Sequence, residues 1–195
     1  MTHHVIYVPG LGDRTPNGQN LAIQLWRLYG LTPHYFPLRW ADKEKLSLKI
    51  DRLLSKIDEL SQQDHPVSLV GVSAGASAVL NAYSNRKNLG AVVSIVGKIH
   101  NPQTIGGTIY KINPAFKESM YLVASSLDKL GEAERARILS LYTPADRTVP
   151  PFDSQVLSGV NRKIFGFGHI SGIFFAVIFG GPSIAAFIRK HADRK

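Results

Sequence analysis

Short apolar runs alternate along the chain with segments whose apolar residues recur at helical spacing. The short runs, bounded by Gly and Pro, predict strands, and the helical spacing predicts helices. Strands are expected at residues 4–8, 33–40, 67–72, 89–97, 136–146 and 162–169, and helices at 18–30, 42–63, 74–86, 118–134 and near the C-terminus. Several strands are nearly all apolar, as expected for strands covered on both faces. The pattern predicts an α/β fold: a mostly parallel sheet flanked by helices on both faces.

Two of the helical patterns have a distinct apolar face. Residues 42–63 are clearly amphipathic, and Gly30 is suited to end the helix at 18–30. The apolar face of the helix at 18–30 consists of Leu21, Leu25, Leu28 and Tyr29. That of the helix at 42–63 consists of Leu46, Ile50, Leu53, Leu54, Ile57 and Leu60.

The length of 195 residues is most simply that of one domain, spanning residues 1–195 and able to bury a substantial core. The chain has no cysteine, which excludes disulfides, cysteine nucleophiles and thiolate metal sites. The N-terminal residues lack the basic and long apolar segments of a signal peptide. We therefore expect a cytoplasmic protein.

The net charge is +9, from 23 Lys and Arg against 14 Asp and Glu. Such a balance can attract nucleic acid, anionic membranes or acidic substrates. The basic residues are spread in short groups, for example at 86–87 and 162–163, and no basic motif is interleaved with aromatic residues. We expect a solvated basic surface and no nucleic-acid partner.

Residues 67–80 change in their middle from a β-branched apolar run to a helix-like run. Ser73 lies at this change, between Gly71 and Gly75, in the sequence GVSAG. Glycines at these two positions leave room for the sharp turn that exposes a nucleophile. The helix start would also point the amide of Ala74 at developing negative charge. Because an ordinary structural turn has a similar sequence, the interpretation of Ser73 depends on partner residues elsewhere.

A serine hydroxyl needs a general base, for which histidine is suited. Ligands of parallel sheets bind at the carboxyl ends of the strands, so a base should follow a strand. Only His100 and His169 among the seven histidines follow a predicted strand directly. His169 is expected to be the base because neighbouring glycines leave room for its ring, and His100 is the alternative. The others precede strands or lie in the charged tail: His3, His4, His34, His65 and His191.

The base needs a carboxylate that orients its ring. Asp146 follows the strand at 136–146, in a loop edged by prolines, and is the expected acid. Asp153 is the nearest alternative, and Asp128 falls in a predicted helix. Ser73, Asp146 and His169 would then meet at one edge of the sheet as a catalytic triad.

The order Ser, Asp, His along the chain, together with the glycine-framed turn, resembles the α/β-hydrolase superfamily. The resemblance extends over the whole chain and includes the segment DRTVP after the acid and Gly-His at the base. It implies a second oxyanion donor in the turn VPGLGDR, residues 8–14, where the amide of Leu11 would act beside that of Ala74. This turn lacks the His that often occurs there in the superfamily. It also lacks the patterns of nucleotide-binding loops, so the alternative to an oxyanion role is a plain glycine-rich turn.

These residues predict a serine hydrolase that cleaves an ester, thioester or amide through an acyl-enzyme, most simply a carboxylesterase. The partner would be a small-molecule acyl substrate, and no metal or organic cofactor is implied. A serine at the turn, in place of an aspartate, argues against epoxide-hydrolase and dehalogenase chemistry. Two alternatives stay open: a non-catalytic binding protein with the same fold, and a membrane-associated acyl-lipid or thioester hydrolase.

Two further segments bear on substrate and location. Residues 99–138 lie where the superfamily often inserts a lid, so a small lid segment that includes a core helix is expected there. Residues 170–188 contain no charge over 19 positions, which is long enough to consider a membrane span. Gly180, Gly181 and Pro182 interrupt this run. We expect a buried loop followed by a terminal helix. The alternatives for this segment are contact with a membrane, the lining of an acyl pocket and the face of a dimer. The protein would accordingly be a monomer or a homodimer.

Overall fold

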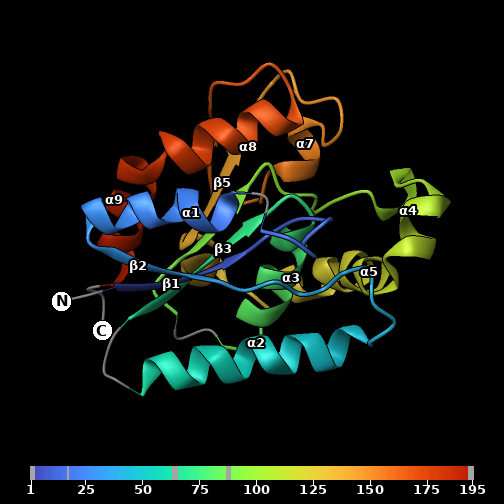
Figure 1. Cartoon of the computed structure of the whole chain (residues 1–195), viewed down its shortest axis with the longest axis horizontal. Helices are drawn as coiled ribbons and strands as arrows, with labels where there is room; N and C mark the ends of the chain where they lie inside the picture. The colour runs from blue at the N-terminus through green and yellow to red at the C-terminus, as the bar shows by residue number, and fades with distance from the viewer. Residues whose placement is uncertain (1–2, 17, 63–65, 87–88, 193–195) are drawn as a thin grey trace.

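A six-stranded sheet forms the centre of the protein (Figure 1). The computed structural model describes residues 3–16, 18–62, 66–86 and 89–192. Within these residues every strand pairing is parallel, and the spatial order is β2-β1-β3-β4-β5-β6. The predicted α/β fold with a mostly parallel sheet is confirmed. The strands are β1 (His3–Val8), β2 (Leu31–Tyr35), β3 (Val67–Val72), β4 (Val92–Ile95), β5 (Ile138–Tyr142) and β6 (Val160–Lys163).

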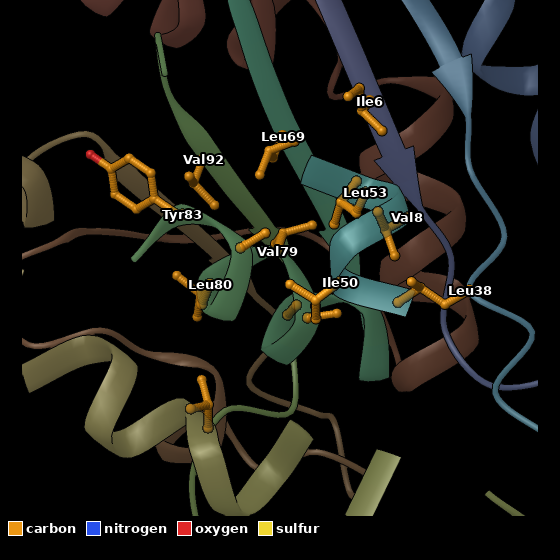
Figure 2. Packing of buried hydrophobic residues seen from close by; sticks show 14 of the residues in the cluster. Ile6, Val8, Leu38, Ile50, Leu53, Leu69, Val79, Leu80, Tyr83 and Val92 are labelled. Carbon is orange, nitrogen blue, oxygen red and sulfur yellow. The ribbon is translucent and has the colours of Figure 1, made fainter. Parts of the chain in front are cut away.

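Helices cover both faces of the sheet. Side chains alternate along each strand, so Ile6 and Val8 belong to one core cluster while Val5 and Tyr7 belong to the other. The first cluster, shown in Figure 2, is covered by α2 (Leu46–Ser61), α3 (Ala74–Tyr83) and α5 (Pro114–Asp128). The second is covered by α1 (Gln19–Ile23), the 3-10 helix η1 (Gln24–Tyr29), α8 (His169–Ile178) and α9 (Gly181–Ala192). Short helices in the connections are η2 (Pro102–Thr104), α4 (Gly107–Ile112), α6 (Glu132–Arg135) and α7 (Pro151–Ser154).

The sheet changes its direction of winding at β1. β2 lies on one side of β1, whereas β3 to β6 follow one another on the other side. The loops after β1 and β3 therefore lead to helices on opposite faces of the sheet, and a crevice opens between the carboxyl ends of these two strands. Leu11 follows β1 and Ser73 follows β3, so the crevice lies between two of the residues that the sequence marks as functional.

The helix predicted at 18–30 is divided in two, and its buried face is not the predicted one. α1 is followed at Gln24 by the tighter turns of η1. Ile23 and Trp26 enter the core, and Trp26 is fixed there because its indole Nε1 donates a 2.8 Å hydrogen bond to the carbonyl of Val177. The predicted apolar face is consequently exposed at Leu21, Leu25 and Leu28.

Several predicted elements differ in their limits. The strand predicted at 33–40 is β2 at Leu31–Tyr35, and the strands predicted at 89–97 and 136–146 are shorter. The helix predicted at 42–63 spans Leu46–Ser61.

The helix predicted at 118–134 starts earlier, at Pro114, because proline suits the first turn of a helix. It ends at Asp128, and the separate helix α6 follows. The strand predicted at 162–169 ends at Lys163, and His169 instead begins α8.

The uncharged segment 170–188 forms parts of two helices, so the buried loop predicted there is wrong. α8 fully buries only Gly172, Ala176 and Val177, while Ile173 packs partly buried against the same core and Ile170 and Phe174 are exposed. α8 and α9 meet at an angle of 67°. In the part of the chain that the structure describes, no single helix is long and apolar enough to cross a membrane, although this bent pair has the necessary length and composition.

Candidate active site

Ser73 occupies a strained turn between β3 and α3. Its backbone has φ 52° and ψ −117°, a region that residues with a side chain rarely adopt. A Cβ added at Gly71 would lie 2.5 Å from the carbonyl oxygen of Gly75, and one added at Gly75 would lie 2.7 Å from that of Pro9. Both glycines are thus required by close backbone contacts, and the turn holds the serine hydroxyl at the carboxyl edge of the sheet.

Backbone hydrogen bonds hold this turn in place. The amide of Ser73 donates to the carbonyl of Ile95 at 3.0 Å, and the carbonyl of Ser73 accepts from the amide of Lys98 at 3.1 Å. Both partners belong to the end of β4 and the residues just after it. These hydrogen bonds to β4 and the residues after it therefore stabilise the strained backbone conformation of Ser73.

His169 connects Ser73 to Asp146. Its Nε2 lies 2.9 Å from the Oγ of Ser73, and its Nδ1 lies 2.7 Å from Oδ2 of Asp146. The imidazole is positioned by the first turn of α8 and the carboxylate by the loop after β5. Only 11% of the histidine side chain and 1% of the aspartate side chain are exposed. The structure thus brings the three residues selected from the sequence into one hydrogen-bonded relay.

Asp146 is oriented by its own loop. Its second carboxylate oxygen accepts hydrogen bonds from the amides of Thr148 at 2.9 Å and Val149 at 2.8 Å. Its amide donates to the carbonyl of Thr143 at 3.2 Å, which closes the turn. Amide donors to a carboxylate stabilise its charge and fix its direction. One oxygen is in this way left for Nδ1 of His169.

The loop after β1 lies directly against the serine. A Cβ added at Gly10 would lie 3.0 Å from the Cβ of Ser73. Asp13 ties this loop to the segment after β2, because its carboxylate accepts hydrogen bonds from the amides of Arg39 at 2.6 Å and Trp40 at 3.2 Å. Burial raises the pKa of Asp13, and the bonds from Arg39 and Trp40 oppose that rise. The carboxylate is thus a buried anchor for the loop.

The backbone amides of Leu11 and Ala74 are available at the same place. Both residues line a cavity together with Ser73. Among the described residues, neither amide donates to a protein acceptor. Ala74 is the first residue of α3, so its amide also belongs to the positive end of a helix. Two free amides next to a serine hydroxyl can stabilise an oxyanion.

Solved structures resemble this chain over nearly its whole length, although no protein-family model and no curated protein matches it. A monoacylglycerol lipase from Paleococcus ferrophilus is 17% identical, with a TM-score of 0.67 and coverage of 97% of this chain and 96% of that one. Est1E from Butyrivibrio proteoclasticus is 13% identical, with a TM-score of 0.71, and an esterase domain from Rhodothermus marinus is 16% identical, with a TM-score of 0.70. Each of these two alignments covers 97% of this chain and 88% of the other.

The solved structures are all members of the α/β-hydrolase superfamily. This protein has the α/β-hydrolase fold. At these identities the likeness concerns the fold, so the chemistry of the site has to be argued from its own residues.

In this α/β-hydrolase fold, the alternative residues considered from the sequence have no hydrogen bond to Ser73 or His169 among the described residues. His100 directs its Nε2 to the carbonyl of Gln155 at 2.8 Å, and its ring packs near that of Phe152. Asp153 forms an ion pair with Lys98. Asp128 is the last residue of α5.

A cavity of about 150 Å³ adjoins the serine. One wall is formed by Leu11, Ser73 and Ala74. The rest comes mainly from η2, α4 and the start of α5, so only part of the segment predicted as a lid at 99–138 covers the site, and α5 packs in the core. The wall residues that sequence reasoning missed are Lys98, Thr104, Ile105, Gly106, Ile109, Phe116, Thr148 and Val149.

A second, open cleft of about 520 Å³ borders His169. It is lined by Phe167 and by residues of the loop that carries Asp146, among them Arg147. Over the described ranges, no group of three or more His, Asp or Glu side chains is placed to hold a metal ion.

Proposed function

We propose that this protein is a serine ester hydrolase that cleaves short acyl esters through an acyl-enzyme. The observation that carries the proposal is the relay from the Ser73 hydroxyl through His169 to Asp146, with distances of 2.9 and 2.7 Å. These are hydrogen-bond lengths suited to proton transfer to a general base and to orientation of that base.

In the acylation step, Ser73 would attack the acyl carbon. Nε2 of His169 would take the hydroxyl proton, while Nδ1–H remains hydrogen-bonded to Asp146. The carboxylate thus sets the tautomer that leaves Nε2 free to accept, and it stabilises the imidazolium that forms. Collapse of the tetrahedral intermediate would expel the alcohol, which receives its proton from His169.

The amides of Leu11 and Ala74 would bind the oxyanion of that intermediate. They border the cavity from the loop after β1 and from the start of α3, on the two sides of the crevice at the change of winding. Fixed amide donors next to a developing charge lower the barrier because they need no reorganisation. Water activated by His169 would then release the acid and restore the serine.

The acyl group would occupy the cavity lined by Leu11, Ile109 and Val149. An apolar cavity of about 150 Å³ holds a molecule the size of benzene, so acyl chains of up to about six carbons are expected to fit. The alcohol would leave through the larger open cleft beside His169, whose size places little restriction on it. The proposed class is therefore a carboxylesterase for short acyl groups.

Labelling with a fluorophosphonate probe tests this proposal. We expect the native chain to be labelled and Ser73→Ala to remain unlabelled, whereas Ser125→Ala, at an exposed serine of α5, should be labelled like the native chain. Hydrolysis of p-nitrophenyl esters of increasing acyl length should then favour short chains. A folded native protein that neither reacts with the probe nor hydrolyses any ester would instead support a non-catalytic binding protein.

A further inference from the structure

The second helical layer exposes a row of large apolar side chains. We refer to them as the outer apolar face. Its members come from α1, η1, α8 and the residues directly before and after α8, and each is between 43% and 81% exposed. They are Leu21, Leu25, Leu28, Phe165, Phe167, Ile170, Phe174 and Phe179.

The outer apolar face is continuous. α1 and α8 lie side by side (Figure 1), and Trp26 of η1 is hydrogen-bonded to the backbone of α8. Both helices bury their inner sides in the same core cluster, so their outer sides both point away from the sheet. Ring contacts link the phenylalanines in sequence, from Phe167 to Phe165 at 5.0 Å, then to Phe175 at 4.7 Å and to Phe179 at 5.1 Å.

The packing of the fold does not account for this exposure. On α8 the positions of Ile170, Phe174 and Ile178 follow one another at i+4 spacing, which places them in one row along the helix. Its inner side instead consists of the buried Gly172, Ala176 and Val177, with Ile173 packed against the same core. A large contiguous apolar surface on a folded chain marks a place where something binds.

The charge of the two segments that carry the outer apolar face indicates the kind of partner. The two segments that supply it, residues 14–41 and 154–192, contain no Asp or Glu. They contain seven Lys and Arg, which is most of the excess behind the net charge of +9. These are Arg14, Arg27, Arg39, Arg162, Lys163, Arg189 and Lys190. Arg39 lines a pocket with Asp42 and Glu44, so the other six are the cations that count for the outer apolar face.

We propose that the outer apolar face docks the protein on an anionic lipid surface. An apolar helix side with flanking cations is the composition of segments that lie in the membrane interface and contact anionic headgroups. Docking would be peripheral, because α9 buries Ile184, Ala185 and Ile188 in the core and would lose that packing by entering a bilayer. The geometry would also bring lipid close to the cleft beside His169, whose lining includes Phe167.

A second copy of the chain is less suited to this face. A two-fold dimer pairs a surface with itself, so the cations of these acid-free segments would face one another. Nothing in those segments supplies the carboxylates that would compensate them. An anionic bilayer provides both the apolar phase and the opposite charge.

Vesicle flotation tests the docking proposal independently of hydrolysis. The native protein should float with vesicles of phosphatidylcholine and phosphatidylglycerol, and less with phosphatidylcholine alone or in high salt, because salt screens the headgroup charge. Ser73→Ala should float equally well, so a failure of the proposed hydrolase function and a failure of docking can be told apart.

The matched variants compare the two helical layers. Leu28→Ser/Phe174→Ser/Phe179→Ser should weaken vesicle binding by about tenfold or more, since it removes three apolar side chains from the contact. The control Leu48→Ser/Tyr121→Ser/Leu122→Ser changes three similarly exposed residues of α2 and α5, on the opposite layer, and should bind as the native protein does. Arg27→Gln/Lys190→Gln should weaken binding to anionic vesicles by about fivefold for each charge removed.

Three results would overturn the proposal. In the first, the folded native protein does not float with anionic vesicles. In the second, the control variant loses binding as much as the triple variant does. In the third, light scattering shows a dimer that the triple variant converts to monomers while vesicle binding is absent, which would assign the outer apolar face to a second copy.

Discussion

Lys98, which lines the cavity beside Ser73, forms a buried ion pair with Asp153. Their side chains are 6% and 4% exposed. The ammonium of Lys98 also donates to the hydroxyl of Thr104 at 2.9 Å, and the side-chain amide of Asn101 donates to Asp153 at 2.5 Å. The pair therefore ties the segment that covers the cavity to α7, just after the loop that carries the proposed acid.

Removal of one partner should strongly destabilise the fold. Lys98→Met leaves the Asp153 carboxylate buried without its cation, and we expect the free energy of unfolding to fall by about 3–5 kcal/mol. Urea denaturation measures this change. The double variant Lys98→Met/Asp153→Leu should recover most of the loss, because it removes the second buried charge as well. Equal instability of both variants would show that charge compensation is not the cause.

Asp146→Asn should abolish most activity without unfolding the protein. The amide group would present a donor to Nδ1 of His169 and so favour the tautomer in which Nε2 cannot accept the serine proton. We expect kcat for p-nitrophenyl acetate to fall by about 10³–10⁴-fold, with little change in KM. Asp128→Asn, at the end of α5, is the control and should keep full activity. A loss of less than tenfold in Asp146→Asn would remove Asp146 from the proposed relay.

His34 should make the protein less stable in mild acid. Its Nε2 lies 2.8 Å from Nδ1 of His4, and burial, followed by the charge of His4, lowers the pKa of His34 below its usual 6.5. His34 therefore binds a proton at a higher pH in the unfolded chain than in the folded chain. The free energy of unfolding falls as the pH drops below 6.5, and it stops falling once the pH is below the pKa of His34 in the folded chain. The slope should reach at most about 1.4 kcal/mol per pH unit. Urea denaturation at several pH values should show a smaller slope for His34→Gln; an unchanged slope would contradict this origin.

The parallel α/β arrangement and the residues of the proposed relay were accessible from the sequence because both depend on local patterns. A buried strand that ends in GVSAG has few other ways to turn, since Gly71 and Gly75 are required by contacts within a few residues and with the loop after β1. Asp146 was placed by the prolines and strand around it. His169 was placed at the correct edge although it begins a helix and does not end a strand.

The parts that the sequence did not predict depend on contacts between distant segments. Residues 18–30 contain two sets of apolar residues that could face the core. The hydrogen bond from Trp26 to Val177 of α8, 151 residues away, favours the set that contains Ile23 and Trp26. The pairing of Lys98 with Asp153 spans 55 residues and follows no sequence motif. The cavity wall likewise combines residues from several loops, so its volume could be known only from the folded chain.

Ile109→Ala should extend the range of accepted acyl chains. Ile109, in α4, lines the cavity beside Ser73. Its aliphatic side chain takes no part in the hydrogen bonds of the relay, so enlarging the cavity at this position should leave the chemistry intact. We expect kcat/KM for acetate esters to change less than threefold, while that for esters of about eight carbons rises by about tenfold, as one or two added methylenes become buried.

Ile112→Ala is the matched control for that change. Ile112 belongs to the same helix and is 57% exposed, but it does not line the cavity. The acyl-length profile of Ile112→Ala should therefore match that of the native protein. If both variants shifted the profile equally, the effect would come from loosening of α4 and not from cavity volume. If neither did, the acyl group would have to bind elsewhere, and the open cleft beside His169 would become the acyl site.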